Sequence, residues 1–263
     1  DILKGSADLS RRAIIYKLQG LSFREYLKLF HHYDVPVLSL AQIINNEIQL
    51  ADIEHPLPLF KDYLKRGYYP FGIENEINVR LGQVIVQTLE TDIPQYANLN
   101  VGTARKLKRL LSIIAESVPF KPNFTKIAAM IGVSRNSLDD YFLYMEQAGL
   151  IAQLRDETGG IRGLGKIDKV YLDNTNIIFN LVGNKLNTGN VRETFFLNQM
   201  RVNNEVISAK TADFVVNEYT FELGGKNKQQ SQIKKDGKSF VVKDDIEFGY
   251  LNVIPLWAFG LNY

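Results

Sequence analysis

The sequence contains no cysteine and only three histidines among its 263 residues. Without cysteine the chain can form no disulfide bond, thiolate zinc site, iron–sulfur cluster or thiol nucleophile. His31, His32 and His55 include no pair at i, i+4, so the sequence gives no support to a histidine metal site. Any metal ion bound by this protein would therefore be held by carboxylates.

Long apolar runs are also absent. No run approaches the roughly 18 residues that a membrane helix needs, and the opening residues, DILKGSADLSRR, lack the apolar core of a secretory signal. We therefore expect a cytoplasmic protein without membrane insertion. Because the chain starts without methionine and enters structured sequence almost at once, we also expect a fragment of a longer protein.

The charges nearly balance, with 31 basic and 29 acidic residues, and 45% of the residues are apolar, which is ordinary for a globular protein. The length favours about two domains. Residues 104–170 carry 11 basic and 7 acidic residues, whereas residues 1–103 carry 10 and 12 and residues 171–263 carry 10 of each. The positive excess is therefore concentrated in the middle of the chain.

Residues 1–103 have the apolar spacing of helices. The run from Ser22 to Glu25 is a capping box that predicts a helix through about Tyr33. The segments LPLFKDYLKRG and INVRLGQVIVQTLE predict two more helices, the first ending at Gly67 in a left-handed conformation. We expect this third of the chain to be entirely helical.

Residues 104–170 follow the pattern of a winged helix-turn-helix domain. After the amphipathic segment ARKLKRLLSIIAESV, Thr125 is positioned to cap a short helix, Gly132 to form the turn, and Ser134 to cap a second helix that ends at Gly149. The segments IAQLR and GKIDKVYL then predict the two strands of a wing.

Such a domain would present the first turn of its second helix to the major groove of DNA. We therefore expect base contacts from the start of that helix and phosphate contacts from the first helix and the wing. Asp139 and Asp140 would repel phosphates, and winged helices also act as protein-binding modules, so DNA and a protein partner both remain open. The candidate base-reading residues are Arg135, Asn136 and Ser137, and the candidate phosphate-binding residues are Lys126, Arg162 and Lys166.

Residues 171–263 change from helical to strand periodicity and predict an α+β region. The helix-like VRETFFLNQMRVNN is followed by short β-branched and aromatic runs with turn residues between them. Glu193 is on the helix, Asp213 in one strand and Glu222 at the end of the next. Asp213 and Glu222 could converge on Mg²⁺, which would activate water for phosphodiester cleavage, with Lys226 as an added cation.

This constellation resembles the PD-(D/E)XK nuclease fold, and the whole chain is similar to the C-terminal half of a family of prokaryotic AAA-type ATPases. RETFFLNQ, FELGGKNK and IPLWAFG carry the resemblance, together with the winged-helix segment. The resemblance implies an α+β architecture in three parts: a helical lid over 1–103, a winged helix over 104–170 and a nuclease-like domain over 171–263. The ATPase core with its Walker loop would lie upstream.

The same resemblance makes Arg11 or Arg12 the candidate arginine that reaches a nucleotide phosphate. An ordinary surface pair of arginines is an equally good interpretation. The run from Gly160 to Ile167 fits G-x-x-x-x-G-K, but Ile167 stands where a Walker loop needs a hydroxyl for Mg²⁺. We therefore do not expect ATP to bind this chain alone.

The nuclease pattern is incomplete, because Gly224 occupies the position two residues after Glu222 where the pattern has lysine. This departure favours a nuclease-like scaffold that does not cleave. We expect the C-terminal portion of an AAA-type ATP-binding protein that binds DNA or a protein partner. The alternatives are a Mg²⁺-dependent DNA nuclease using the three carboxylates and Lys226, and a protein-interaction module without nucleic acid. A homo-oligomer also remains open.

Overall fold

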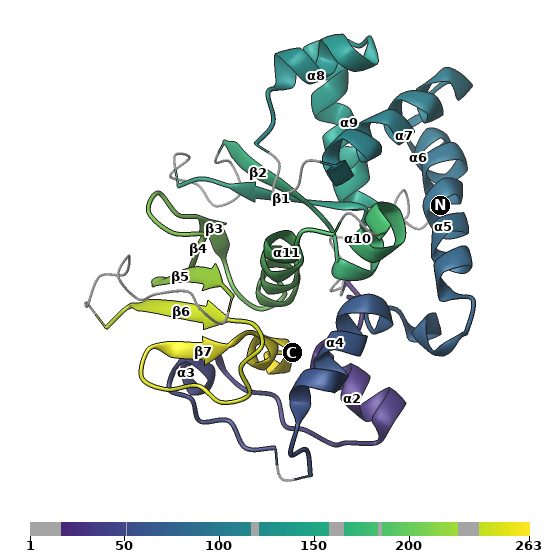
Figure 1. Cartoon of the computed structure of the whole chain (residues 1–263). Coiled ribbons are helices and arrows are strands. Elements are labelled where there is room, and N and C mark those ends of the chain that lie inside the picture. The colour runs from purple at the N-terminus through teal and green to yellow at the C-terminus, as the bar shows by residue number, and fades with distance from the viewer. Residues whose placement is uncertain (1–16, 51, 117–120, 158–165, 184–185, 226–236) are drawn as a thin grey trace, which may run out of the picture.

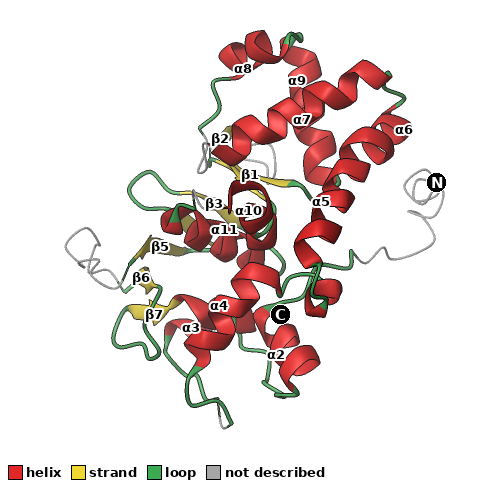
Figure 2. Ribbon diagram, turned by 45° about the vertical axis from the view of Figure 1, so that its right-hand side comes forward, coloured by secondary structure: helices red, strands yellow, loops and turns green. Residues whose placement is uncertain are grey.

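Helices make up most of the first half of the chain, and strands gather in the second half (Figures 1 and 2). The computed structural model describes residues 17–50, 52–116, 121–157, 166–183, 186–225 and 237–263. Within these ranges the fold is α+β, as the sequence predicts. Of the helices described there, none has the length and apolar character needed to cross a membrane.

The elements follow the predicted order closely. The helices are α2 (Phe23–His31), α3 (Leu40–Ile44), α4 (Pro56–Arg66), η1 (Pro70–Ile73), α5 (Ile77–Gln87), the π-helical turn η2 (Thr88–Asp92), α6 (Ile93–Ala97), α7 (Val101–Glu116), α8 (Phe124–Ile131), α9 (Arg135–Gln147), α10 (Thr175–Val182), α11 (Thr188–Met200) and η5 (Leu256–Leu261). The strands are β1 (Ile151–Arg155), β2 (Ile167–Leu172), β3 (Val206–Ser208), β4 (Phe214–Val216), β5 (Tyr219–Gly224), β6 (Ser239–Lys243) and β7 (Val253–Pro255).

The strands form two sheets. β1 and β2 are an antiparallel hairpin, and β3 to β7 form a five-stranded sheet in sequence order. In the larger sheet β3, β4 and β5 are antiparallel neighbours, while β5, β6 and β7 run parallel. The register places Phe214 of β4 opposite Phe221 of β5. Asp213, directly before β4, therefore lies next to Glu222 on the neighbouring strand.

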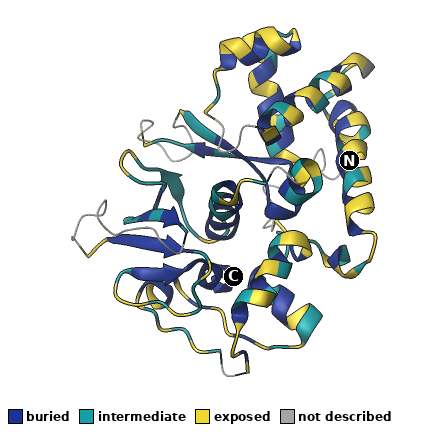
Figure 3. Cartoon of the chain, viewed as in Figure 1, coloured by how far each residue is buried: buried dark blue, intermediate teal, exposed yellow. Residues whose placement is uncertain are grey.

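Helix α11 lies between the larger sheet and the helices α4 and α10, and most of its residues are buried (Figures 1 and 3). A helix that is buried all round must present apolar side chains in several directions. The ring of Phe196 packs on the aromatic residues of the sheet and of η5, whereas Phe195 packs on Phe60 and Tyr63 of α4. α11 is thus the central element that joins the sheet to the helices.

The predicted helices in residues 17–103 are present, and they pack in two directions. The capping box at Ser22 is confirmed, because its side chain accepts from the main-chain N–H of Glu25. α2 and α4 pack against η5 at the end of the chain, while η2 and α6 pack against α7. One apolar core runs through all of these elements. The expectation that residues 1–103, 104–170 and 171–263 are three separate domains therefore stays a prediction.

One predicted helix end is wrong. Gly67 ends α4 with φ −85°, which is a right-handed conformation that any residue could adopt. Glycine is needed there for space, because a Cβ at position 67 would collide with the rings of Tyr63 and Tyr26. The reason for glycine at this position is therefore tertiary packing and not a left-handed turn.

In the middle of the chain, α8 and α9 are joined by a tight turn and followed by the β1–β2 hairpin. Gly132 forms the turn with φ +68°, and Ser134 accepts from the main-chain N–H of Ser137 to cap α9, as predicted. The cap of α8 is Asn123, whose side chain accepts from the N–H of Lys126. The prediction of Thr125 as this cap is wrong, since Asn123 precedes it with an equally suitable side chain.

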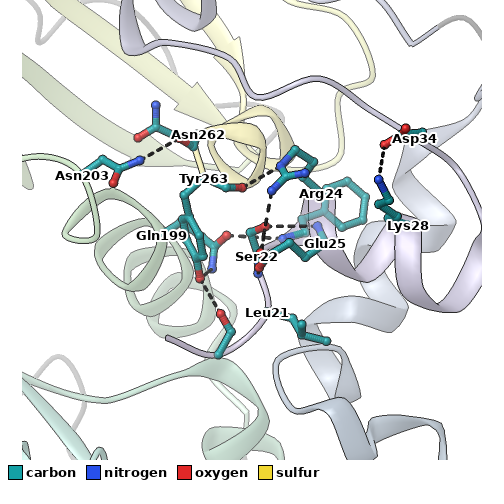
Figure 4. A network of polar contacts seen from close by, with 12 residues as sticks. Leu21, Ser22, Arg24, Glu25, Lys28, Asp34, Gln199, Asn203, Asn262 and Tyr263 are labelled. Carbon is teal, nitrogen blue, oxygen red and sulfur yellow. Dashed lines mark hydrogen bonds and ion pairs between the residues drawn. The ribbon is translucent and has the colours of Figure 1, made fainter. Parts of the chain in front are cut away.

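A polar network holds the first described residues against the last (Figure 4). The hydroxyl of Tyr263 donates to the carbonyl of Gly20 at 3.0 Å, and the hydroxyl of Tyr63 donates to that of Leu21 at 2.7 Å. Gln199 of α11 donates to the Tyr63 hydroxyl at 3.0 Å. Arg24 of α2 donates to the main-chain oxygen of Tyr263 at 2.9 Å. Residues far apart in sequence therefore meet beside α11.

Candidate functional site

The three carboxylates singled out in the sequence lie close together in the structure. Glu193 projects from α11, Asp213 lies directly before β4, and Glu222 lies within β5. The packing of α11 on β5 and the pairing of β4 with β5 bring these positions to one place. We call Glu193, Asp213 and Glu222 the carboxylate cluster. Lys226, the predicted cation of this cluster, lies outside the described residues.

A lysine that the sequence analysis did not select lies within this cluster. The ammonium Nζ of Lys169, on β2, is 3.6 Å from Oε2 of Glu193 and 3.9 Å from Oδ1 of Asp213. Its side chain is only 12% exposed, and Nζ lies 5.9 Å from the centre of the Phe214 ring. Within the described residues, the hairpin therefore brings a positive charge to Glu193 and Asp213.

The carboxylates of the cluster also accept hydrogen bonds from neutral groups. The hydroxyl of Tyr171, two residues after Lys169 on the same face of β2, donates to Oε2 of Glu193 at 2.6 Å. Burial and the charge of Glu193 raise the pKa of Tyr171, so this hydroxyl stays protonated and remains a donor. The main-chain N–H of Leu223 donates to Oδ2 of Asp213 at 2.8 Å.

The negative charges of the cluster act on one another. Burial raises the pKa of Asp213 to about 6, and the charges of Glu193 and Glu222 act in the same direction. The Leu223 N–H and the Lys169 ammonium oppose this shift without cancelling it. Lys169 therefore offsets only part of the effect that burial and the neighbouring carboxylates have on the pKa of Asp213.

The arrangement of ligands for a metal is less complete than the sequence suggests. Within the described ranges, no group of three or more histidine, aspartate or glutamate side chains is arranged to hold a metal ion. Asp213 and Glu222 as a magnesium pair therefore stay a prediction. What the described geometry provides is an ion-paired and hydrogen-bonded cluster in which Lys169 is the cation.

The side chain at the start of α9 that was expected to read bases is held by its own neighbours. The guanidinium of Arg135 pairs with Asp139, with Nε 3.2 Å from Oδ1, and stacks over the ring of Phe124 with its centre 4.1 Å away. The hydroxyl of Ser137 lies 2.8 Å from that of Ser134. Asn136 is exposed. Arg135 would have to break two interactions before it could contact a base.

The candidate phosphate-binding residues are only partly described. Lys126 on α8 and Lys166 beside the hairpin are exposed. Arg162, like the candidate nucleotide-binding residues Arg11 and Arg12, lies outside the described residues. The sequence predictions for these three arginines therefore stay predictions.

An open cleft of about 800 Å³ separates α8 and α9 from the hairpin. Its lining carries both signs of charge: the acidic side chains are Asp139 and Asp140 of α9, and the basic ones are Lys121, Arg135, Arg155 and Lys166. Leu143, on the exposed side of α9, adds an apolar side chain. A surface of mixed charge with apolar side chains is typical of protein contacts, whereas DNA contacts are strongly basic.

Comparison with known proteins places the chain in a family without assigning an activity. The chain is 22% identical over 162 residues to an uncharacterised protein of Methanocaldococcus jannaschii, and the alignment covers 58% of this chain and 34% of that protein. The aligned part thus spans about a third of that relative's length. No solved structure matches the chain significantly. Residues 57–188, half of the chain, match the family model of a domain of unknown function, DUF8612. The chain therefore belongs to the DUF8612 family.

Proposed function

We propose that this chain is the C-terminal, non-catalytic part of an AAA-type ATPase, and that it binds a protein partner without cleaving nucleic acid. In this proposal α8, α9 and the β1–β2 hairpin form a winged helix, and α11 with the larger sheet forms a nuclease-like domain. The resemblance of RETFFLNQ, FELGGKNK and IPLWAFG to that family supports the assignment. ATP hydrolysis would reside in a core upstream of this chain.

The position of Lys169 is the observation that carries the proposal of a non-cleaving domain. Its ammonium lies 3.6 and 3.9 Å from the carboxylates of Glu193 and Asp213 and supplies positive charge where a nuclease would use a divalent ion. Mg²⁺ dehydrates reluctantly and needs nearly ideal octahedral geometry. It would have to displace a covalently attached cation that is already largely buried. The cluster then serves the structure and not hydrolysis.

The choice of a protein over DNA as the partner rests on the charge of α9. Asp139 and Asp140 lie at the cleft where phosphates would approach, and Asp139 already neutralises Arg135. DNA binding depends on basic side chains that are free to displace counterions from phosphates. Leu143 is exposed on the same helix, which suits an apolar contact with a protein.

A magnesium titration tests the non-cleaving assignment. We expect the melting temperature of the wild-type chain to stay unchanged in 10 mM Mg²⁺. If a tight Mg²⁺ site were present, Mg²⁺ at roughly 100 times its Kd would add about 2.7 kcal/mol to the free energy of unfolding and raise the melting temperature. We also expect no nicking of supercoiled plasmid. The Lys169→Met variant tests whether removing the cation opens the cluster to Mg²⁺. Lys28→Met, which removes an exposed lysine paired with Asp34, is the matched control. Mg²⁺-dependent nicking by the wild type that disappears in Asp213→Ala would establish the nuclease alternative instead.

A DNA titration at several salt concentrations tests the choice of partner. We expect no shift of duplex DNA at physiological salt, and Arg135→Ala should behave like the wild type. If DNA binds with a log–log salt slope of about −0.9 for each phosphate contacted, the winged helix is a DNA-binding module and the protein-partner assignment is wrong.

The upstream reading frame tests the ATPase assignment. We expect the gene to extend before residue 1 into a strand followed by G-x-x-x-x-G-K-[ST] and a helix. A start codon at residue 1 would remove this part of the proposal.

A further inference from the structure

A small pocket of about 200 Å³ lies between the π-helical turn η2, α6 and α9. Pockets that enclose a whole drug-sized ligand have roughly 300–1,000 Å³, so this one suits a single head group or side chain. Asp92, Tyr96 and Gln147 are exposed, and a ligand from solvent can therefore reach them. The polar side chains that line the pocket are Thr88, Asp92, Tyr96, Tyr144 and Gln147.

Two tyrosine rings form aromatic walls of this pocket. The ring centres of Tyr96 on α6 and Tyr144 on α9 are 6.5 Å apart, and the ring planes are nearly perpendicular, at 83°. The face of a tyrosine ring attracts a cation that lies within about 6 Å of the ring centre, and this cation is more often an arginine than a lysine. The aromatic part of the lining therefore suits a positively charged group.

Asp92 gives the pocket a negative charge that the described part of the chain does not neutralise. Within the described residues, no lysine or arginine lines the pocket, and Asp92 forms no ion pair or hydrogen bond. Glu90, two residues earlier in the same turn, is by contrast paired with Lys108. A cation supplied from outside would complement the charge of Asp92. The carboxylate and the two rings thus favour the same kind of ligand.

The π-helical turn brings part of this lining together. The N–H of Ile93 donates to the carbonyl of Thr88, five residues earlier, and Thr88 and Asp92 are the first and last residues of the turn. Such turns are rare and are frequently found at functional sites. The irregular backbone and the pocket therefore coincide.

The polar groups of the pocket favour a guanidinium over other cations. The side chains of Thr88 and Gln147 form no hydrogen bond within the described residues, and both can accept one. A guanidinium has five N–H donors in one plane, can bind a carboxylate with two of them and stacks on aromatic rings. A quaternary ammonium has no N–H donor for these acceptors. A lysine ammonium is strongly hydrated and has no planar face.

The charge of the lining also indicates that the guanidinium belongs to a protein. Free arginine carries an α-carboxylate, which would require a positive partner, and the described lining contains no basic residue. An arginine within a polypeptide has no such carboxylate. The volume of about 200 Å³ is also that of a side-chain site rather than of a site for a larger ligand.

We propose that this pocket binds the guanidinium of an arginine side chain presented by a partner protein. The carboxylate of Asp92 pairs with the guanidinium, and the rings of Tyr96 and Tyr144 flank it. None of the residues that line this pocket lines the cleft between α8, α9 and the hairpin or belongs to the carboxylate cluster. The inference therefore holds or fails independently of the proposed function.

The test uses the whole 263-residue chain and N-acetyl-L-arginine amide as the probe. Binding is followed by the ring resonances of Tyr96 and Tyr144, and we expect both to shift to saturation. N-acetyl-L-citrulline amide has nearly the same shape without the charge. It should bind about 3- to 30-fold more weakly, the combined value of an exposed ion pair and a cation–π contact. Free L-arginine and tetramethylammonium should bind no more tightly than the capped arginine.

A charge reversal provides the sharpest variant. Asp92→Lys should remove the preference for the arginine probe over the citrulline probe. The melting temperature should stay the same, because the side chain of Asp92 makes no capping hydrogen bond to α6. Asp140→Lys, at an equally exposed aspartate of α9 outside the pocket, is the matched control and should keep the preference. Tyr96→Leu should weaken binding of the arginine probe by about 2- to 5-fold, the value of one exposed cation–π contact.

Three outcomes would overturn the inference. The first is that the two ring resonances do not move with millimolar arginine probe. The second is that arginine and citrulline probes bind equally to the wild type, or that Asp92→Lys keeps the preference for arginine. The third is that tetramethylammonium or free arginine binds more tightly than the capped arginine, which would assign the pocket to a small organic cation.

Discussion

Replacing Asp213 by asparagine should stabilise the protein at neutral pH. Asp213 shares one lysine with Glu193, and the charge of Glu222 acts on it as well. Removing its charge leaves Lys169 paired with Glu193. Asparagine keeps a side-chain oxygen that can accept the Leu223 N–H, which now donates to Asp213 at 2.8 Å. The substitution therefore changes the charge and keeps the shape.

The expected gain follows from the shift in pKa. An aspartate has a pKa of about 3.9 in the unfolded chain, and that of Asp213 is raised to about 6 in the folded protein. Two pKa units correspond to about 3 kcal/mol, at about 1.36 kcal/mol per unit. Since the side chain is 20% exposed and solvent screens part of this cost, we expect Asp213→Asn to raise the free energy of unfolding by about 1–3 kcal/mol at pH 7 to 8.

The effect should depend on pH with a definite sign. A carboxyl whose pKa is raised by folding binds its proton more tightly in the folded state. It therefore favours folding below about pH 4, and this contribution is lost as the pH rises through about 6. The advantage of Asp213→Asn should accordingly be full above pH 7, shrink between pH 6 and 4, and vanish below pH 4.

Urea unfolding at a series of pH values measures this directly. Trp257 is the single tryptophan of the chain and is buried, so its fluorescence reports loss of the core. Asp34→Asn, an exposed aspartate paired with Lys28, is the control and should change the free energy by less than about 1 kcal/mol. A variant less stable than the wild type at pH 8, or a difference that does not vary with pH, would refute the reasoning.

Four further outcomes are expected from the same unfolding assay. Lys169→Met should lower the free energy of unfolding by about 3–5 kcal/mol, because the largely buried carboxylates of Glu193 and Asp213 lose the charge of Lys169. An unchanged free energy of unfolding would mean that water solvates the cluster. Phe195→Ala should lower the free energy of unfolding by about 3–5 kcal/mol, because it leaves a cavity beneath α4. Unfolding should remain a single transition. Separate transitions for the helices and the sheet would contradict the central place of α11. Gly20→Ala should cost about 1–3 kcal/mol, since its Cβ would enter the buried ring of Tyr68; an unchanged midpoint would show that the ring moves freely. Arg135→Ala should cost no more than about 1 kcal/mol, because its ion pair with Asp139 is exposed, and a larger loss would mean that this arginine supports the helix.

Local signals in the sequence predicted much of the fold. Ser22, Gly132 and Ser134 act through atoms within a few residues of themselves, and each forms the cap or turn expected of it. The strand periodicity also located β1 and β2 correctly. The errors arose where two neighbours could serve equally, as with the cap of α8, or where distant side chains decide, as at Gly67.

The candidate site was predictable only in part for the same physical reason. The convergence of Asp213 and Glu222 follows from the pairing of their two strands. Lys169 lies on β2, and its contact with Glu193 joins segments 24 positions apart whose packing no local pattern specifies. The alternation of Lys169 with Tyr171 along a strand was the one available signal, and it indicates a shared face without indicating what covers that face.

The network that holds residues 20–22 beside the end of the chain has a mechanical consequence. Leu21 donates its N–H to the carbonyl of Tyr68, and its own carbonyl accepts from Tyr63, while Gly20 is held by Tyr263. A pulling force applied at residue 17 would load these three hydrogen bonds before it reached α8, α9 or the hairpin. The load would pass through Tyr63 and Tyr263 to Gln199 on α11. Such a force would therefore strain the elements around α11 first.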